Sequence, residues 1–236
     1  MERIWLKEWF GIKFREFAKL NENELAGSKF YEMFYQRFHQ RYSSFEELPD
    51  NWKIQKKQVA IDINTHAKLK KTILSIGCGI GYIEKILFEM RGGGIIAIEP
   101  SASAARWLKD IIEVRNGYFP HVILGQQFDL AYASVIDYSM SDSDYLCFLR
   151  KMHDSRIPEF MLVNLLTGRK YWNSQSHLKE LLKSALSFLK IRPRGQFWGY
   201  LRSLEEQITF LKKAGYQNIM IGQHGNLDTY WLKAIR

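Results

Sequence analysis

Three glycines in the segment ILSIGCGIG, residues 73–81, are the residues with the clearest chemical meaning in this sequence. Gly77, Gly79 and Gly81 follow a short apolar run and precede an amphipathic one. A strand that leads into a glycine-rich turn and then a helix N-terminus offers backbone N–H groups and the positive end of a helix dipole to a ligand. Glycine also allows close backbone approach and positive φ angles. The segment therefore predicts a site for a nucleotide-like ligand.

The spacing of these glycines separates two kinds of nucleotide-binding turn. It reads GxGxG, whereas a dinucleotide fingerprint, GxGxxG, would need glycine at position 82, which is Tyr82. Glu99 lies 18 residues after Gly81, at the end of the apolar run IIAIE. A carboxylate there can accept hydrogen bonds from both hydroxyls of a ribose. The pattern disfavours the alternative of a dinucleotide-binding oxidoreductase.

An α/β scaffold is needed to position these residues, and the sequence predicts one. From residue 72 onward, short apolar runs alternate with helical segments, which implies parallel strands joined by crossovers. We predict strands at 72–76, 94–98, 129–134, 160–165, 218–223 and 229–235 and helices at about 81–90, 101–114, 142–154 and 203–214. The short connection HGNLD makes the last two strands an antiparallel pair. Ser203 and Glu206 form a capping box at the start of the last helix, and Gly215 ends it.

The first 71 residues predict a separate, helical cap. Aromatic residues recur there at helical spacing, first at Trp5, Trp9, Phe10, Phe14 and Phe17, and more regularly at Phe30, Tyr31, Phe34, Tyr35, Phe38 and Tyr42. A polar helix is expected at about 52–69. The sequence therefore predicts a cap at 1–71 and a ligand-binding domain at 72–236, with a basic, aromatic insertion at 167–202 that forms a lid over the substrate.

Composition and charge limit the possible functions. The chain has 236 residues, a formal net charge of +9 and two cysteines, Cys78 and Cys147. Two cysteines give no disulfide framework or zinc set, so a cytoplasmic protein is expected. The N-terminus has no apolar signal region, and no apolar run approaches the roughly 20 residues of a membrane span. Residues 151–202 carry a net charge of +7, which indicates an anionic substrate, a nucleic acid or a solvated basic surface.

At this point the chain resembles the class I S-adenosylmethionine (SAM)-dependent methyltransferases over about residues 72–236. The segments that carry the resemblance are ILSIGCGIG, AIEPS, QFDLAYAS and the terminal AGYQNIMI and YWLKAIR. The resemblance implies a Rossmann-like α/β sheet of seven mostly parallel strands with an antiparallel last strand, to which this chain adds N-terminal helices. It also implies SAM as the cofactor and methyl transfer as the reaction.

The resemblance assigns cofactor contacts residue by residue. The methionine part of SAM is expected against Gly77, Cys78, Gly79 and Gly81. Glu99 is expected to hold the ribose, with Pro100 and Ser101 beside it, and Ser134 to lie near the methionine amino group and the transferred methyl. The adenine contact is expected from the segment around Asn116, Gly117 and Tyr118, with Tyr118 against the base.

The sequence departs from the family pattern at Ser75, and its third strand must be short. The family usually has Asp or Glu at the position of Ser75, where the charge helps to bind the ammonium group of SAM. A serine hydroxyl can accept a hydrogen bond but lacks the charge, which is worth roughly a factor of two in hydrogen-bond strength. We therefore expect weaker but intact SAM binding.

The methyl acceptor is less clearly marked. The strand that continues as AYASVIDY lacks the Asn/Asp-Pro-Pro-aromatic motif of nucleobase amine methylation, and no dense metal-ligand cluster appears. Candidate bases are Asp137, Tyr138 and His177, although a packed tyrosine, a helix-capping aspartate and a surface histidine are equally ordinary roles. The insertion suggests Arg169, Lys170, Trp198 and Arg202 as substrate contacts, because arginine and aromatic faces suit a sugar or a phosphate.

We therefore expect O-methylation of a small, polar, anionic metabolite, such as a sugar, nucleotide-sugar or phospho-metabolite. Bacterial surface-glycan synthesis is one interpretation of such a role. The alternatives are an RNA methyltransferase, because the same residues suit stacked RNA bases, and a SAM-binding protein without catalysis. A homodimer is also possible, with the insertion as its interface.

Overall fold

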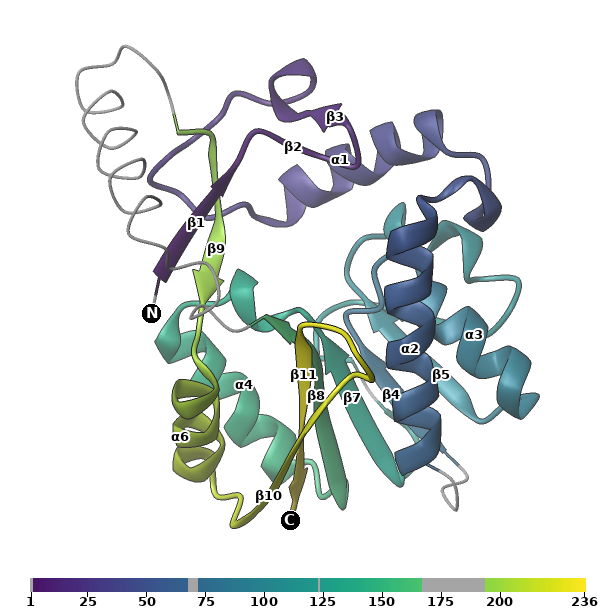
Figure 1. The fold of residues 1–236 in the computed structure, drawn as a ribbon, viewed down its shortest axis with the longest axis vertical. Coiled ribbons are helices and arrows are strands. Elements are labelled where there is room, and N and C mark those ends of the chain that lie inside the picture. Colours follow the sequence, from purple (N-terminus) through teal and green to yellow (C-terminus); the bar gives the residue numbers. More distant parts are fainter. Residues whose placement is uncertain (1, 68–71, 123, 167–193) are drawn as a thin grey trace.

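The computed structural model describes residues 2–67, 72–122, 124–166 and 194–236 and contains a seven-stranded sheet. Its strands are β4 (Ile73–Ile76), β5 (Ile95–Glu99), β6 (Glu113–Asn116), β7 (Leu130–Ser134), β8 (Glu159–Leu166), β10 (Asn218–Gln223) and β11 (Thr229–Ile235), in the spatial order β10-β11-β8-β7-β4-β5-β6 (Figure 1). Neighbours from β8 to β6 pair in parallel, and β11 is antiparallel to both β8 and β10. The predicted strands are present to within one residue, and the antiparallel terminal pair is confirmed.

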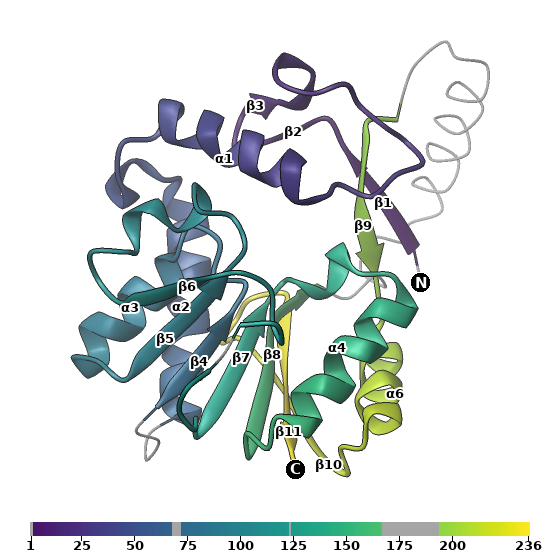
Figure 2. The ribbon, with the colours of Figure 1, turned by 180° about the vertical axis from the view of Figure 1, so that it is seen from behind.

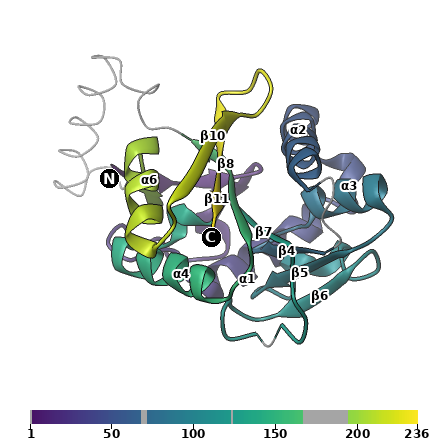
Figure 3. The same cartoon turned by 90° about the horizontal axis from the view of Figure 1, so that it is seen from below.

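Helices cover both faces of the sheet, as Figure 3 shows from below. Helix α2 (Asp50–His66) and α3 (Tyr82–Arg91) lie on one face, and α4 (Asp142–Asp154) and α6 (Leu204–Ala214) lie on the other. Successive strand residues point to opposite faces, so Ile73 packs with the first pair of helices and Leu74 with the second. Burial on both faces explains why the parallel strands read as continuous apolar runs.

The helix predicted over 101–114 is absent. Only a short 3-10 helix, η3 (Ala104–Trp107), forms there, followed by turns and by β6. The Ser101 hydroxyl accepts a hydrogen bond from the Ala104 backbone N–H at 3.0 Å and donates one to Glu32 at 2.7 Å. Such local side-chain bonds compete with helical ones. The third strand is short, as the sequence indicated.

The cap mixes strands with its helices, which corrects the purely helical prediction. Helix α1 (Ser28–Arg41) follows the second aromatic set, but residues 2–13 form the short strands β1 (Glu2–Leu6), β2 (Glu8–Trp9) and β3 (Ile12–Lys13). Strand β1 pairs antiparallel with β9 (Gln196–Leu201), at the end of the predicted insertion. Pairing with a segment so distant in sequence overrides the local helical spacing of Trp5 and Trp9.

The cap therefore combines the N-terminal residues with β9, a strand from the second half of the chain. Figure 2 shows α1 and the β1–β9 pair above the carboxyl ends of β4, β5 and β7, where the glycine-rich turn lies. Residues 167–193 of the insertion lie outside the described residues. Among the described residues, none of the helices has the length and apolar character needed to cross a membrane.

Candidate active site

A cavity of about 960 Å³ lies between the cap and the carboxyl edge of the sheet. This volume is near the upper end of the range for small-molecule sites, so it has room for two ligands. The glycine-rich loop and the ends of β5 and β7 line one side. Apolar and aromatic cap residues line the other, among them Ile4, Leu6, Trp9, Phe10, Phe38 and Trp198.

The glycine-rich loop has the backbone conformation that its sequence predicted. Gly77, Gly79 and Gly81 have φ angles of 71°, 57° and 81°, in the left-handed region that disfavours side chains. A Cβ atom added at Gly79 would lie 3.2 Å from the Tyr35 hydroxyl, so the loop and the cap leave no room for one without a shift. Gly77, Cys78 and Gly79 line the cavity. Gly81 is instead the N-cap of α3, packed against Leu108.

Glu99 is held rigidly beside this loop. Its carboxylate accepts hydrogen bonds from the backbone N–H groups of Gly79, at 2.8 Å, and Ser101, at 2.9 Å. The side chain is 6% exposed. Burial raises its pKa to about 7, although the two backbone hydrogen bonds oppose the shift. Glu99 therefore faces the cavity with a fixed orientation and a limited charge near neutral pH.

The other predicted cofactor residues divide into two groups. Pro100, Ser101, Tyr118 and Ser134 line the cavity with Glu99, whereas Gly117 and Asn116 do not. The Asn116 amide instead donates hydrogen bonds to the carbonyls of Glu99 and Pro100, both at 3.1 Å. These bonds hold β6 against the end of β5. Tyr118 is half-exposed at the cavity rim.

Ser75 is buried and contacts a carboxylate that the sequence analysis missed. Its hydroxyl donates a hydrogen bond to Glu84 Oε1 at 2.5 Å, and the Tyr132 hydroxyl donates one to the same oxygen at 2.6 Å. Glu84 lies in the first turn of α3, and it lines the cavity. Burial raises its pKa, although the bonds from Ser75 and Tyr132 and the charge of Lys56 oppose the shift. The available signal was a glutamate among the apolar residues Ile83, Ile86 and Leu87 of the predicted helix.

Two of the proposed catalytic residues line the cavity near its aromatic side. Asp137 and Tyr138 belong to the 3-10 helix η4 (Asp137–Ser139). The Tyr138 hydroxyl lies 3.0 Å from that of Tyr31, and its ring stacks on Trp198 at a centroid distance of 5.9 Å. Burial raises the pKa of Tyr138 to about 12. Asp137 accepts a hydrogen bond from the Gln207 side chain at 2.6 Å, and burial raises its pKa as well.

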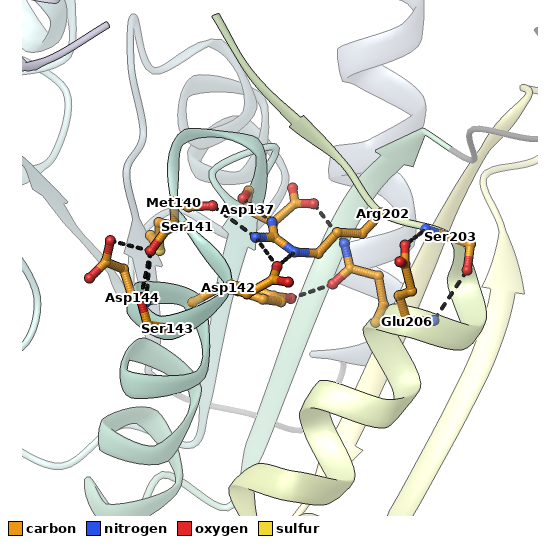
Figure 4. A network of polar contacts seen from close by, with 11 residues as sticks. Asp137, Met140, Ser141, Asp142, Ser143, Asp144, Arg202, Ser203 and Glu206 are labelled. Atoms are coloured by element: carbon orange, nitrogen blue, oxygen red, sulfur yellow. Dashed lines mark hydrogen bonds and ion pairs between the residues drawn. The ribbon is translucent and has the colours of Figure 1, made fainter. Parts of the chain in front are cut away.

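Arg202, which the sequence analysis predicted as a substrate contact, is not among the residues that line the cavity. Its side chain is fully buried, and its guanidinium donates to the carbonyls of Asp137 and Met140 and forms an ion pair with Asp142 at 2.9 Å (Figure 4). An arginine has five N–H donors. It can therefore bond several acceptors of the turn at residues 137–142 at once. Trp198 lines the cavity as predicted, while Arg169, Lys170 and His177 lie outside the described residues.

A buried histidine near the end of β8, His224, was also missed. Asn164 lines the cavity at a β-bulge where Tyr230 and Leu232 pair with Leu165 and Leu162, and its φ angle is 59°. The His224 ring accepts from the Asn164 backbone N–H at 3.0 Å and bonds Asp62 at 2.7 Å. No local motif in the sequence joins these residues, which come from α2, β8 and the hairpin between β10 and β11.

Comparison with known proteins identifies the fold. No family's sequence profile matches the chain, and no curated protein sequence matches it. Solved structures do match. Human N-acetylserotonin methyltransferase in complex with SAM aligns with 95% of this chain and 62% of its own, at 15% identity and a TM-score of 0.63. The mitomycin 7-O-methyltransferase MmcR aligns with 96% of this chain and 61% of its own, at 20% identity and a TM-score of 0.61.

A third match has nearly the same length as this chain. Magnesium protoporphyrin IX methyltransferase from Synechocystis, with bound S-adenosylhomocysteine (SAH), aligns over 88% of this chain and 95% of its own, with a TM-score of 0.61 and 11% identity. This chain has the fold of the SAM-dependent methyltransferases. The fold expected from the sequence is thereby confirmed.

The methyltransferase fold accounts for the position of the cavity. Ligands of open α/β sheets bind outside the carboxyl ends of the strands where the strand order reverses. Here β4 lies between β5 and β7, so the chain leaves β4 toward one side and later returns to the other. The glycine-rich loop follows β4 at this point. The chain spans 62–66% of the length of the first three matched structures.

Proposed function

We propose that this protein transfers a methyl group from SAM to an oxygen atom of a small molecule. The observation that carries the proposal is the continuity of one cavity, which joins the glycine-rich loop and Glu99 to an aromatic chamber under the cap. The matched proteins include enzymes named as O-methyltransferases and structures with bound SAM or SAH. Bound SAM supplies an activated methyl group on a sulfonium sulfur.

The residues of the first half of the cavity fit SAM. Gly77, Cys78 and Gly79 can follow the methionine part closely, because two of them lack side chains. Glu99 can accept hydrogen bonds from ribose hydroxyls, since both of its oxygens already have a fixed orientation. Tyr118, at the rim, can cover the adenine. Glu84 and Ser134 each have a buried oxygen without a partner among the described residues, as expected in a site that binds a ligand with several donors.

The second half of the cavity favours an acceptor with a flat, largely apolar ring. Trp9, Phe10 and Trp198 line it, and Trp198 lies stacked between Phe14, at 5.2 Å, and Tyr138, at 5.9 Å. A packed aromatic cluster of this kind offers a fixed, apolar wall to another ring. Methyl transfer needs such positioning, because the rate depends on alignment of the acceptor oxygen with the methyl carbon.

An anionic acceptor, such as a sugar phosphate, is the second candidate. Its support from Arg202 is lost, because that side chain is bonded away from the cavity. Lys29 and Lys56 line the cavity and supply the remaining cationic groups of the described lining. Burial lowers the pKa of Lys56 to about 8, so it is only partly protonated above that pH.

We assign the role of general base to Asp137. The described lining has four carboxylates. Glu32 and Glu99 both hydrogen-bond to Ser101, and Glu84 accepts hydrogen bonds from Ser75 and Tyr132. Asp137 instead adjoins Tyr138 on the aromatic side. A raised pKa moves its basicity toward neutral pH, as suits a base. The Tyr138 hydroxyl, with a pKa of about 12, stays protonated and can donate a hydrogen bond that orients the acceptor.

The experiment that tests the proposal is a transfer screen with methyl-labelled SAM. The panel comprises hydroxylated aromatic compounds, sugar phosphates and bulk RNA. Labelling of a ring hydroxyl supports the first candidate, and labelling of a sugar phosphate supports the second. Labelled RNA, or binding to RNA that falls steeply with salt, would favour the RNA methyltransferase. SAM binding by calorimetry without transfer to any acceptor would indicate a binding protein without catalysis.

A further inference from the structure

Glu84 is a buried carboxylate with one unused oxygen at the wall of the cavity. The residue is 1% exposed. Its Oε1 accepts the two hydroxyl hydrogen bonds from Ser75 and Tyr132, whereas its Oε2 is buried without a partner among the described residues. Burying a carboxylate oxygen without a partner is costly. Its position in the lining therefore indicates a ligand that donates to it.

The position of Glu84 compensates for the missing acid at residue 75. The resemblance described above places Asp or Glu at the end of β4, where this chain has Ser75. Glu84 Oε1 lies 2.5 Å from the Ser75 hydroxyl, so α3 brings a carboxylate to the place that an acidic side chain at 75 would occupy. Tyr132, the cross-strand partner of Ser75 on β7, fixes the same oxygen from the other side.

The chemistry of the surroundings specifies a cationic donor. The described residues contain no group of three or more His, Cys, Asp and Glu that could hold a metal ion. An alkylammonium group carries three donors and no acceptor. Glu84 Oε2 and Ser134 Oγ, both buried and without a partner in the described part of the chain, are acceptors in the lining of the same cavity. Lys56 also lines it, with its ammonium 5.6 Å from the centre of the Trp52 ring.

We propose that Glu84 binds the α-ammonium group of the methionine part of SAM. In this chain the acidic residue lies in the first turn of α3 and not at the end of β4, and hydrogen bonds from Ser75 and Tyr132 orient it. This inference rests on the proposed function and adds a cofactor-binding residue to it. It replaces the expectation that Ser75 alone weakens the methionine end of the site.

The test combines changes in the protein with a change in the ligand. Glu84→Gln keeps the size of the side chain and an acceptor for Ser75 and Tyr132, but removes the charge. Calorimetry should show SAH binding weakened about 10-fold or more, because a charged hydrogen bond is lost. Methylthioadenosine, which lacks the amino-acid part, should bind the wild type and the variant equally. Equal weakening for both ligands, or for neither, would overturn the inference.

The second arm of the test returns the acidic side chain to the end of β4. Glu84→Ser should weaken SAH binding by at least the same factor, and adding Ser75→Asp to it should restore binding to within about threefold of wild type. A double variant that folds by circular dichroism but stays as weak as Glu84→Ser contradicts the inference. Failure of the wild-type protein to bind either SAM or SAH would instead refute the proposed function itself, so the two failures are distinguishable.

Discussion

At the scale of single residues, the side of the cavity that we propose binds SAM, here the cofactor side, contains two buried carboxylates, Glu84 and Glu99. Burial is the largest influence on both Glu84 and Glu99, and it raises both pKa values. The negative charge of Glu84 also raises the pKa of Glu99. Without ligand, the protein therefore holds these groups at a cost, which a ligand with hydroxyl and ammonium donors would offset.

The first prediction concerns the pH dependence of stability through Glu99. Its pKa is about 7 in the folded protein, above the ordinary value of 4.5. The folded state thus binds the proton more tightly, and this contribution to stability is fully present below pH 4.5 and is lost as pH rises through 7. Replacing Glu99 by Gln removes the titration. Between pH 4.5 and 8, the free energy of unfolding should fall by up to about 3 kcal/mol more in the wild type than in the variant.

Urea unfolding of the ligand-free proteins at a series of pH values measures this difference. Gln places an amide N–H₂ where Gly79 or Ser101 donates, so the variant should be less stable at low pH. The prediction concerns only how the difference in free energy of unfolding between the two proteins changes with pH. Parallel pH profiles for the two proteins would show that Glu99 titrates normally in the folded state.

At the scale of elements, strand β9 connects the cap to η4, the turn that contains Asp137 and Tyr138. It pairs with β1 on one side and packs on η4 on the other. A Cβ atom at Gly199 would lie 2.3 Å from the Tyr138 carbonyl oxygen. A glycine is therefore required at this position, because the backbones of β9 and η4 approach each other closely.

The second prediction is that Gly199→Ala disrupts the acceptor side of the cavity and spares the cofactor side. The added methyl must push η4 away, at a cost of about 1–3 kcal/mol in the free energy of unfolding. The KM of the acceptor should rise, while the dissociation constant of SAH stays within about twofold. Gly27→Ala is the control, because a Cβ there has no atom within 4 Å although Gly27 also lines the cavity. An equal loss of SAH affinity would contradict this separation.

The third prediction concerns the turn between β7 and α4, which Arg202 holds together. Arg202→Met keeps an apolar stem next to Tyr145 but removes every donor to Asp137, Met140 and Asp142. The free energy of unfolding should fall by about 3 kcal/mol, because buried carbonyls and a carboxylate lose their partner. Arg150→Met, at an exposed position of α4, should change it by less than about 0.5 kcal/mol. A stable Arg202→Met protein with a raised acceptor KM would restore the substrate role.

At the scale of the whole molecule, the sheet was predictable and the cap was not. The strands predicted from the sequence are largely apolar runs bounded by turn residues, and their places follow from local pattern and crossover rules. Strand β6, with the sequence EVRN, has no such run. The β1–β9 pair, the Ser75–Glu84 contact and the Asp62–His224–Asn164 chain join residues far apart in sequence or hidden in a helix. Such contacts leave no periodic signal, so the sequence did not single out Glu84, whereas Gly77, Gly79 and Glu99, which it did single out, line the same cavity.

The fourth prediction tests the ligand preference of the assembled fold. A ligand that binds only the folded state at about 100 times its dissociation constant stabilises it by about 2.7 kcal/mol. For a chain of this size, SAH should then raise Tm by about 5–10 °C. NAD⁺ at the same concentration should leave Tm unchanged, because Tyr82 occupies the position where a dinucleotide turn needs glycine. Stabilisation by NAD⁺ and not by SAH, in differential scanning fluorimetry, would mean that the sheet binds a dinucleotide.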